Sequence, residues 1–531
     1  MSFRTRGVGA VIAAGALVAA VGSVSPTAAA PNNNSVAKLT KAVTLEGVVD
    51  HLEAFQAIAD EYGDRAAGRD GYKASVDYVV AELRAAGYTP VVQEFEFPYF
   101  EENSELVRDD PATSWVDGRD FLRAQFPTGV PEGTATGVVV PVDFADPPVP
   151  DMPAGAGGTS GCTADDFAGF PEGAIALVQR GGCGFAVKAL NAQAAGASAV
   201  IVANDGRTGL VGMIGDAAGL EIPAIFVTTQ VGLDLASTPD ATVTVTVDFA
   251  AETRVTWNVL AETATGNDAN TVMAGAHLDS VQDGAGINDN GSGSAALLET
   301  AIQMSKVKPN NTVRFAWWGA EEEGLLGSEY YVENLADTAL DDIALYLNFD
   351  MIASPNYFFG VYDGDNSGGT APAGFIPAGS AQIEDVFERY YTSIGQPYQD
   401  SEFSGRSDYG PFIAVGIPAG GLFTGAEGEK TAAEAALYGG VPGASYDPCY
   451  HQPCDNLTGA GQDAELYAAL EEDYDLVGNV NAFALDVNSD AVAASIITFA
   501  FDTSTVNDVS APGRSHGAGK SLDAMKNKLT R

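Results

Sequence analysis

The stretch that most constrains the fold runs from Asn311 to Tyr331, with the sequence NTVRFAWWGAEEEGLLGSEYY. Its first part, Val313 to Trp318, is an apolar run of the kind that a buried strand needs. Gly319 ends the run, three carboxylates follow, and the residues after Glu323 are typical of the start of a helix. A buried strand that delivers carboxylates at its carboxyl end places them where open α/β sheets hold their ligands. The alternative is a solvated acidic helix start, because Glu favours the first turn of a helix.

The rest of the chain predicts an α/β fold with a mixed, mainly parallel sheet flanked by helices, because strands alternate with helices. Near the N-terminus we expect helices from Leu45 and over Gly71–Ala86, with Gly87 as a C-cap, and then a strand over Val91–Phe97. Further on, the expected strands are Val272–Gly275, Val313–Trp318 and Ile343–Phe349, and the expected helices are Gly291–Met304, Ile383–Ile394 and Ala491–Ala500.

The middle of the chain has a different texture, with short strands separated by turns rich in Gly, Pro and Asp. Its central part, Ile175–Val202, resembles the protease-associated domain, both in the turn RGGCGF from Arg180 and in the helix that carries Lys188. The resemblance implies an inserted, β-rich, non-catalytic cap that shapes substrate access, and the alternative is a packing module with no binding role. We expect residues 31–128 to form the N-terminal part of the main domain, 129–250 the insertion, 251–503 the catalytic domain and 504–531 a flexible or removable tail.

The N-terminus has the three parts of a secretory signal in residues 1–30. Arg4 and Arg6 are basic, Val8 to Val21 is apolar, and Ala28 to Ala30 supplies small residues for cleavage. The alternative is a membrane anchor, but the run is shorter than the ~20 residues needed to span a bilayer. We therefore expect a secreted, extracellular protein without stable membrane association. The formal net charge of −45 also argues against nucleic acid or anionic membrane as a partner.

The chain has four cysteines, an even number, and an exported protein uses such residues as disulfides. Their positions suggest the pairs Cys162 with Cys183 and Cys449 with Cys454. A zinc finger is a weaker interpretation, because no C-x-x-C pair is present and the compartment is oxidising.

Two of the four histidines stand among carboxylates that follow expected strands. His277 follows the strand Val272–Gly275, and Asp279 is close enough in sequence to support its imidazole. The other members of this group are Asp289 in a glycine-rich turn, Glu321 and Glu322 after their strand, Asp350 after Phe349, and His451 between Cys449 and Cys454. Such positions converge at the carboxyl edge of a parallel sheet. Two His and several carboxylates suit Zn²⁺, and a pair of zinc ions is used by aminopeptidases.

The combined motifs are His277-x-Asp279, Asp289-Asn-Gly-Ser-Gly, Glu321-Glu322-x-Gly-Leu, Asn-Phe-Asp350-Met and Tyr450-His451. In this order they resemble the secreted di-zinc aminopeptidases of the aminopeptidase Y type, which belong to the zinc exopeptidases. The resemblance implies that Asp289 bridges two zinc ions, that His277 and Asp350 complete one, and that Glu322 and His451 complete the other. It implies that Glu321 is the general base for a bridging water and that Tyr450 donates a hydrogen bond to the oxyanion.

The expected function is a secreted zinc-dependent aminopeptidase that removes N-terminal, apolar residues from peptides or proteins with a free N-terminus. Glu323 is expected to be solvated and not a ligand, and Arg406 either lines the substrate crevice or forms a structural ion pair. A calcium site elsewhere is left open. A carboxypeptidase of the same superfamily would need a basic pocket, a glutaminyl cyclase would use one zinc, and a catalytically dead binding module would lack ligands. The complete ligand set favours the aminopeptidase.

Overall fold

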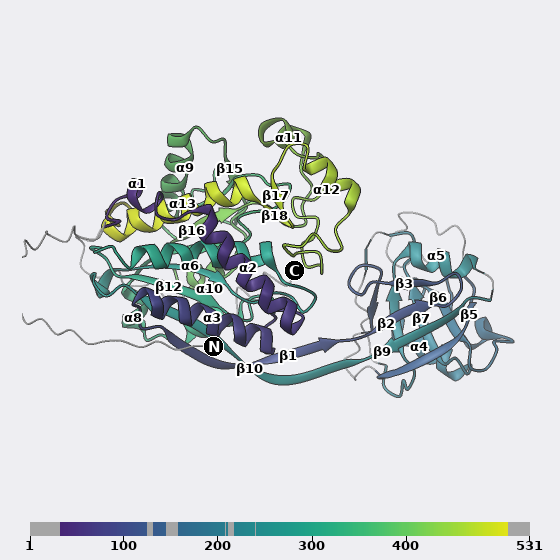
Figure 1. Ribbon diagram of the computed structural model, residues 1–531. Coiled ribbons are helices and arrows are strands. Elements are labelled where there is room, and N and C mark those ends of the chain that lie inside the picture. The colour runs from purple at the N-terminus through teal and green to yellow at the C-terminus, as the bar shows by residue number, and fades with distance from the viewer. Residues whose placement is uncertain are drawn as a thin grey trace, which may run out of the picture. The chain divides into compact units, whose positions relative to one another are not determined.

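The computed structural model describes residues 32–507 except 125–130, 145–157, 208, 211–216 and 239. The expected signal peptide and the expected tail beyond residue 507 lie outside this range. The chain divides into two compact units (Figure 1): residues up to Gln93 together with those from Trp257 onward form the first, and Glu94–Thr256 form the second. The second unit is therefore an insertion in the sequence of the first.

The first unit is built on a mixed sheet of eight strands among the described residues, in the order β1-β10-β12-β11-β13-β16-β14-β15. The central strands β12, β11, β13 and β16 are parallel to one another, so their carboxyl ends share one edge. The strands are β1 (Val91–Glu102), β10 (Phe249–Glu262), β11 (Thr271–His277), β12 (Val313–Trp318), β13 (Ile343–Phe349), β14 (Gly360–Tyr362), β15 (Gln399–Ser401) and β16 (Ala419–Phe423).

Helices cover both faces of this sheet. Successive side chains of β12 point to opposite faces, and the apolar residues on each face need a covering layer. Phe315 and Trp317 face one helical layer, whereas Ala316 and Trp318 face the other. The first layer contains α1 (Val36–Leu39), α2 (Leu45–Tyr62), α3 (Asp70–Ala86), α6 (Gly293–Met304), α9 (Ser380–Ile394), α13 (Ala482–Phe501) and α14 (Ser504–Asn507). The second contains α7 (Leu326–Glu333), α8 (Asp337–Asp341) and α10 (Tyr409–Ala414). The remaining elements of the unit are α11 (Ala432–Tyr438), α12 (Ala464–Leu470), β17 (Leu476–Val477) and β18 (Val480–Asn481).

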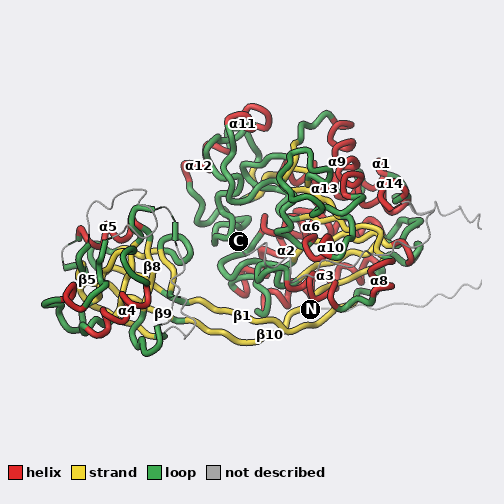
Figure 2. Tube along the Cα trace, turned by 180° about the vertical axis from the view of Figure 1, so that it is seen from behind, coloured by secondary structure: helices red, strands yellow, loops and turns green. Residues whose placement is uncertain are grey.

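The second unit is also organised around a sheet of eight strands within its described part, in the order β3-β2-β9-β5-β6-β7-β8-β4. Its strands are β2 (Glu105–Arg108), β3 (Thr113–Trp115), β4 (Phe121–Arg123), β5 (Gly133–Pro141), β6 (Ile175–Gln179), β7 (Ala199–Ala203), β8 (Ala224–Val227) and β9 (Thr242–Val247). The helices α4 (Phe185–Ala194) and α5 (Thr229–Ser237) pack on it. Strands β1 and β10 carry the chain out of the first unit and back into it (Figure 2).

The second unit begins earlier than residue 129, where we expected the insertion to start. The segment before residue 129 had no clear sequence pattern, but β2 pairs with β9 and β4 pairs with β8. These strands are only three or four residues long, which is too short to show a reliable alternation. At the other end of the chain, α14 extends the folded region into the expected tail, because Val506 is buried in the core of the first unit.

Among the described residues, one helix is long and apolar enough to cross a membrane by length and composition, namely α13. Its most apolar window is 72% buried inside the first unit. It packs against α6, α9 and α2, which is the environment of a core helix in a globular domain.

Candidate metal centre and active site

Three of the predicted ligand segments meet at the carboxyl edge of the parallel strands. His277 is the last residue of β11, and it lies opposite Trp318 at the end of β12. Glu321 and Glu322 follow β12, and Asp350 directly follows β13. The parallel register therefore brings an imidazole and three carboxylates to one place, as the sequence predicted.

Asp289 reaches the same place from the turn before α6. The backbone at Asp289 and Asn290 is not helical, with φ values of −105° and −122°, and regular α-helix begins only at Gly293. We expected this helix from Gly291. The irregular turn is the physical reason for the difference, because its backbone departs from helical geometry before the helix begins.

His451 comes from a loop closed by a disulfide. Cys449 and Cys454 are bonded, as are Cys162 and Cys183, and both pairs match the expected ones. His451 has a left-handed backbone, with φ of 54°, and its ring stacks on that of Tyr450 at a centroid distance of 3.8 Å. A left-handed non-glycine residue is uncommon and often marks a functional site.

The two imidazoles approach different oxygens of Asp289. His277 Nε2 is 3.2 Å from Asp289 Oδ1 and 3.3 Å from Asp350 Oδ1. His451 Nε2 is 3.3 Å from Asp289 Oδ2 and 2.9 Å from Glu322 Oε2. The five predicted ligands therefore form two groups that share one carboxylate.

The donor set fits zinc, because catalytic zinc sites use imidazole nitrogens and carboxylate oxygens. His277, Asp289 and Glu322 place ligand atoms within 4.8 Å of one another. Glu322 Oε1 is buried and has no hydrogen-bond partner among the described residues, which is unusual for a carboxylate oxygen unless a cation binds there. Two further groupings, Asp363–Asp365–Glu384 and Glu384–Glu388–Asp400, are acidic clusters to which we assign no ion.

Asp279 contacts His277 and the two glutamates that follow β12, but its carboxylate is too far from the imidazole for a hydrogen bond. His277 Nδ1 is 3.0 Å from the backbone oxygen of Asp279 and 3.7 Å from its carboxylate. The Asp279 carboxylate instead accepts the backbone N–H groups of Glu321 and Glu322, both at 3.3 Å. Asp279 thus fixes the acidic pair after β12, in addition to orienting His277 through its main chain.

Four carboxylates, those of Asp289, Glu321, Glu322 and Asp350, surround two imidazoles in this site, and they shift one another's pKa values. Burial lowers the pKa of His451, but the hydrogen bonds that its imidazole donates to Asp289 and Glu322 outweigh it and raise this pKa to about 10. Burial and the neighbouring charge of Asp289 raise the pKa of Glu322 to about 7. Burial also raises the pKa of Glu321 well above its ordinary range, with His277 opposing the shift and Asp350 adding to it. Such a site favours cations.

The site opens into a cavity of about 850 Å³. Its lining includes Tyr450 beside the ligands and a set of apolar side chains, among them Leu325, Met351, Phe358, Tyr362 and Phe423. Arg406 lines this cavity and also lies 3.3 Å from Glu427, in an exposed ion pair. Glu323 lines the same cavity and is partly buried, so it is less solvated than expected. This burial raises its pKa to about 7.

Several residues around the site had no signal in the sequence. Ser407 donates a hydrogen bond to Asp350 Oδ2 at 2.5 Å, and Asp455 accepts the backbone N–H of Asp289 at 3.0 Å. These partners are distant in sequence, so only the fold brings them together. Of the other histidines, His51 lies in α2 with Nδ1 2.6 Å from Tyr78 Oη, and His516 lies outside the described residues.

Comparison with known proteins places the chain in a family. Residues 258–467 match Peptidase family M28, and residues 136–235 match the PA domain. An aminopeptidase of Pseudomonas aeruginosa is 43% identical over 499 residues, which are 92% of this chain and 87% of that protein. Leucine aminopeptidase 2 of Trichophyton tonsurans is 37% identical over 87% of this chain and 85% of its own length.

Among solved structures, the zinc aminopeptidase of Bacillus subtilis has a similar fold. Its TM-score is 0.54 at 21% identity, and the match covers 88% of this chain and 98% of that one. The comparisons identify the family but not the Y type within it. Since the sequence relatives extend over most of the chain, the protein belongs to peptidase family M28 and is a zinc-dependent aminopeptidase with an inserted PA domain.

Proposed function

We propose that the enzyme works with two zinc ions that share the carboxylate of Asp289. His277 and Asp350 would complete one site, and Glu322 and His451 the other. The observation that carries this proposal is the position of Asp289, whose two oxygens face two different imidazoles at 3.2 and 3.3 Å. When bound, zinc polarises a peptide carbonyl and lowers the pKa of a water molecule toward ~7.

Glu321 is the general base of the proposed mechanism. Its backbone N–H is held by Asp279, and its side chain lines the cavity beside the ligands. It accepts a proton from the attacking water and delivers that proton to the leaving amine. A buried carboxylate among other carboxylates is a stronger base than an exposed one, which suits this role.

Tyr450 stabilises the negative charge that develops on the substrate carbonyl oxygen. Its ring is fixed by stacking on His451. Burial and the charges of Asp289 and Glu322 raise the pKa of its phenol, so that it stays a hydrogen-bond donor. A donor of this kind typically contributes about 3 kcal/mol to catalysis.

The substrates are peptides, and we propose a preference for apolar N-terminal residues. The cavity beside the ligands has an apolar part formed by Met351, Phe358 and Phe423. One relative is named a leucine aminopeptidase, which agrees with this preference. The acidic groups in the same cavity would attract the free α-ammonium of a substrate and explain exopeptidase action.

We also propose that residues 1–30 are a signal peptide and that the mature enzyme is secreted. Two disulfides support export to an oxidising compartment. We propose that the segment matching peptidase family M28 is the catalytic domain and that the PA domain is its cap. Calcium elsewhere stays a prediction, which metal analysis of the purified enzyme would test together with the expected two zinc ions per chain.

The function is tested with aminoacyl p-nitroanilides, with and without a zinc chelator, beside N-acetylated substrates. We expect hydrolysis of Leu-p-nitroanilide that is lost on chelation, restored by zinc, and absent when the amine is acetylated. Faster turnover of Leu than of Asp substrates would support the apolar preference. Hydrolysis of the acetylated substrate, or full activity after zinc removal, would refute the proposal.

A further inference from the structure

The segment Ala285–Asp289 ends at the proposed shared ligand. Two buried side chains that are far apart in the sequence, Arg65 and Asp455, form hydrogen bonds with its backbone. Arg65 comes from the turn between α2 and α3, and Asp455 follows the disulfide loop that carries His451. Arg65 is fully buried and Asp455 is 2% exposed. Neither residue contacts substrate space, so neither has a role in the mechanism above.

Arg65 binds the carbonyl side of this region with its whole guanidinium group. Nε donates to Ala285 O at 2.7 Å, Nη2 donates to Gly286 O at 2.7 Å, and Nη1 donates to Leu278 O at 2.5 Å. Leu278 separates His277 from Asp279, so one side chain connects the end of β11 with the approach to Asp289. Only the planar fork of arginine reaches three carbonyls at once, and lysine does not reproduce it.

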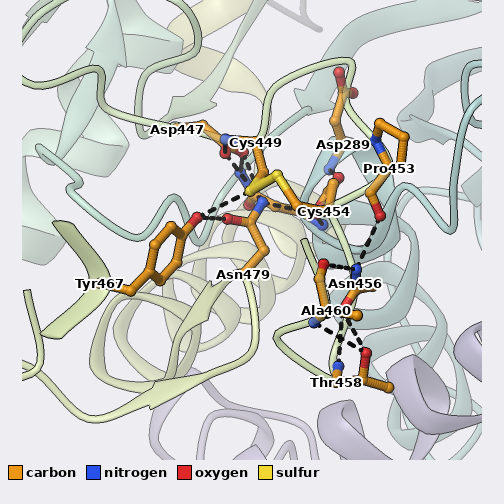
Figure 3. The surroundings of a disulfide bond; sticks show 12 residues. Asp289, Asp447, Cys449, Pro453, Cys454, Asn456, Thr458, Ala460, Tyr467 and Asn479 are labelled. Carbon is orange, nitrogen blue, oxygen red and sulfur yellow. Dashed lines mark hydrogen bonds between the residues drawn. A yellow bond between two sulfur atoms is a disulfide. The ribbon is translucent and has the colours of Figure 1, made fainter. Parts of the chain in front are cut away.

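Asp455 binds the N–H side of the same segment. Its Oδ1 accepts Asn288 N at 2.9 Å, and its Oδ2 accepts Asp289 N at 3.0 Å. Asn479 donates to Oδ1 at 2.7 Å and also to Asp447, on the other side of the loop. Figure 3 shows Asp289, Asp447 and Asn479 around the Cys449–Cys454 disulfide. Asp455 therefore connects the shared carboxylate to the loop of His451.

The two side chains bind the same five-residue segment, Arg65 through its carbonyl groups and Asp455 through its N–H groups. Burial lowers the pKa of Arg65 to about 10, with Asp279 and Asp455 opposing the shift, so the guanidinium is charged at neutral pH. A guanidinium that donates to the carbonyl groups and a carboxyl group that accepts the N–H groups both favour the same backbone orientation. Loss of either would leave buried polar groups of the segment unsatisfied.

We propose that Arg65 and Asp455 are positioning residues that act as a unit to hold Asp289 in the geometry that binds zinc. The inference rests on the proposed role of Asp289 as a shared ligand. Residues that orient metal ligands typically change metal affinity by about 10–100-fold when they are replaced. Since both hold the same segment, loss of one removes most of the benefit of the other.

The test compares R65M, D455N and the double variant, with R65K as a milder change that keeps the charge. Zinc affinity is measured on the metal-free proteins by competition with a chromophoric chelator, and the melting temperature is measured with and without zinc. Two variants serve as matched controls. R314M removes a half-buried arginine that pairs with Glu262 on β10, and D363N removes a buried carboxylate that accepts two backbone N–H groups.

We expect each single variant to bind zinc about 10–100-fold more weakly, R65K to lie between wild type and R65M, and the double variant to be little worse than the weaker single one. The controls should lower the melting temperature of the metal-free protein and leave zinc affinity unchanged. Unchanged zinc affinity in R65M and D455N would reduce both residues to a structural role, and multiplicative losses in the double variant would show that they act independently. If D289N binds zinc as tightly as wild type, the proposed function itself fails.

Discussion

At the residue scale, two neighbouring glutamates have different surroundings although the sequence presents them as equals. Glu322 has an oxygen with no hydrogen-bond partner in the described chain and lies 2.9 Å from His451. Glu321 lines the same cavity and has no such contact with either imidazole. Asp279 binds the N–H groups of both and thereby sets the direction in which each side chain leaves the backbone.

This difference predicts the effect of Glu321→Gln. The variant should keep its zinc, because the five proposed ligands are intact, and lose kcat by roughly 10²–10⁴-fold, because the proposed base is gone. Steady-state kinetics with Leu-p-nitroanilide and metal analysis of the same sample would measure both effects. Glu333→Gln, which changes an exposed carboxylate outside the cavity lining, is the matched control and should stay near wild type. Near-normal turnover of the Glu321 variant would remove that residue from the role of base.

Glu384 predicts a pH dependence of stability away from the site. Burial raises its pKa from 4.5 to about 8, with Asp365 both opposing the shift through its N–H and adding to it through its charge. Between those values the folded state holds a proton on Glu384 that the unfolded state has lost. The stability that this proton contributes is complete below pH 4.5 and is lost as the pH rises through 8. Glu384→Gln mimics the protonated form. Its melting temperature should match wild type at pH 5 and exceed it by about 2–4 °C at pH 8.5.

The proposed ligands could be found in the sequence, whereas the residues that hold them could not. His277 and Asp350 each stand at or just after a strand with a strong apolar pattern, so their position at the sheet edge follows from the strand. Arg65, Ser407 and Asp455 have partners more than 50 residues away, and most of those partners are backbone atoms. A backbone partner imposes no residue type that a single sequence could reveal.

At the element scale, long apolar strands and helices were predictable and short polar ones were not. The strand Val313–Trp318 has the expected bounds, and α2, α3 and α9 lie over the segments where helices were expected. Strands β14 and β15 have three residues each, and β16 contains two glycines, so neither length nor propensity identified them. Their place in the sheet is set by pairing with β13 and with one another.

Strand β11 predicts a severe effect of a small substitution. A Cβ at Gly275 would lie 2.3 Å from Tyr346 Oη and 2.6 Å from Trp318 Nε1, and these two atoms are hydrogen-bonded to each other. Gly275→Ala should therefore lower the free energy of unfolding by roughly 1–3 kcal/mol, and more if the ring pair separates. Gly184→Ala, where a Cβ meets open space, is the control. Equal melting temperatures for the two variants would contradict this packing.

At the scale of the whole molecule, the formal net charge of −45 predicts a strong dependence on salt. Repulsion among surface carboxylates destabilises the compact state, and salt screens it. We expect the melting temperature to rise by about 2–5 °C between 20 mM and 0.5 M NaCl. NaCl and KCl at equal ionic strength should act alike. A rise seen only with sulfate would point to exclusion of that ion from the surface and not to screening.

Strands β1 and β10 are neighbours in the sheet, and Asn258 Nδ2 donates to Gln93 Oε1 at 3.0 Å. The chain therefore leaves the catalytic unit and returns to it at adjacent points, as the two arms of a hairpin do. Evolution could gain or lose residues 94–256 at this junction without rearranging any ligand segment, so relatives of different length can share one chemistry. A protein engineer could exploit the same junction by joining Gln93 to Trp257 through a tight turn, which would yield a minimal peptidase or an acceptor site for a foreign module.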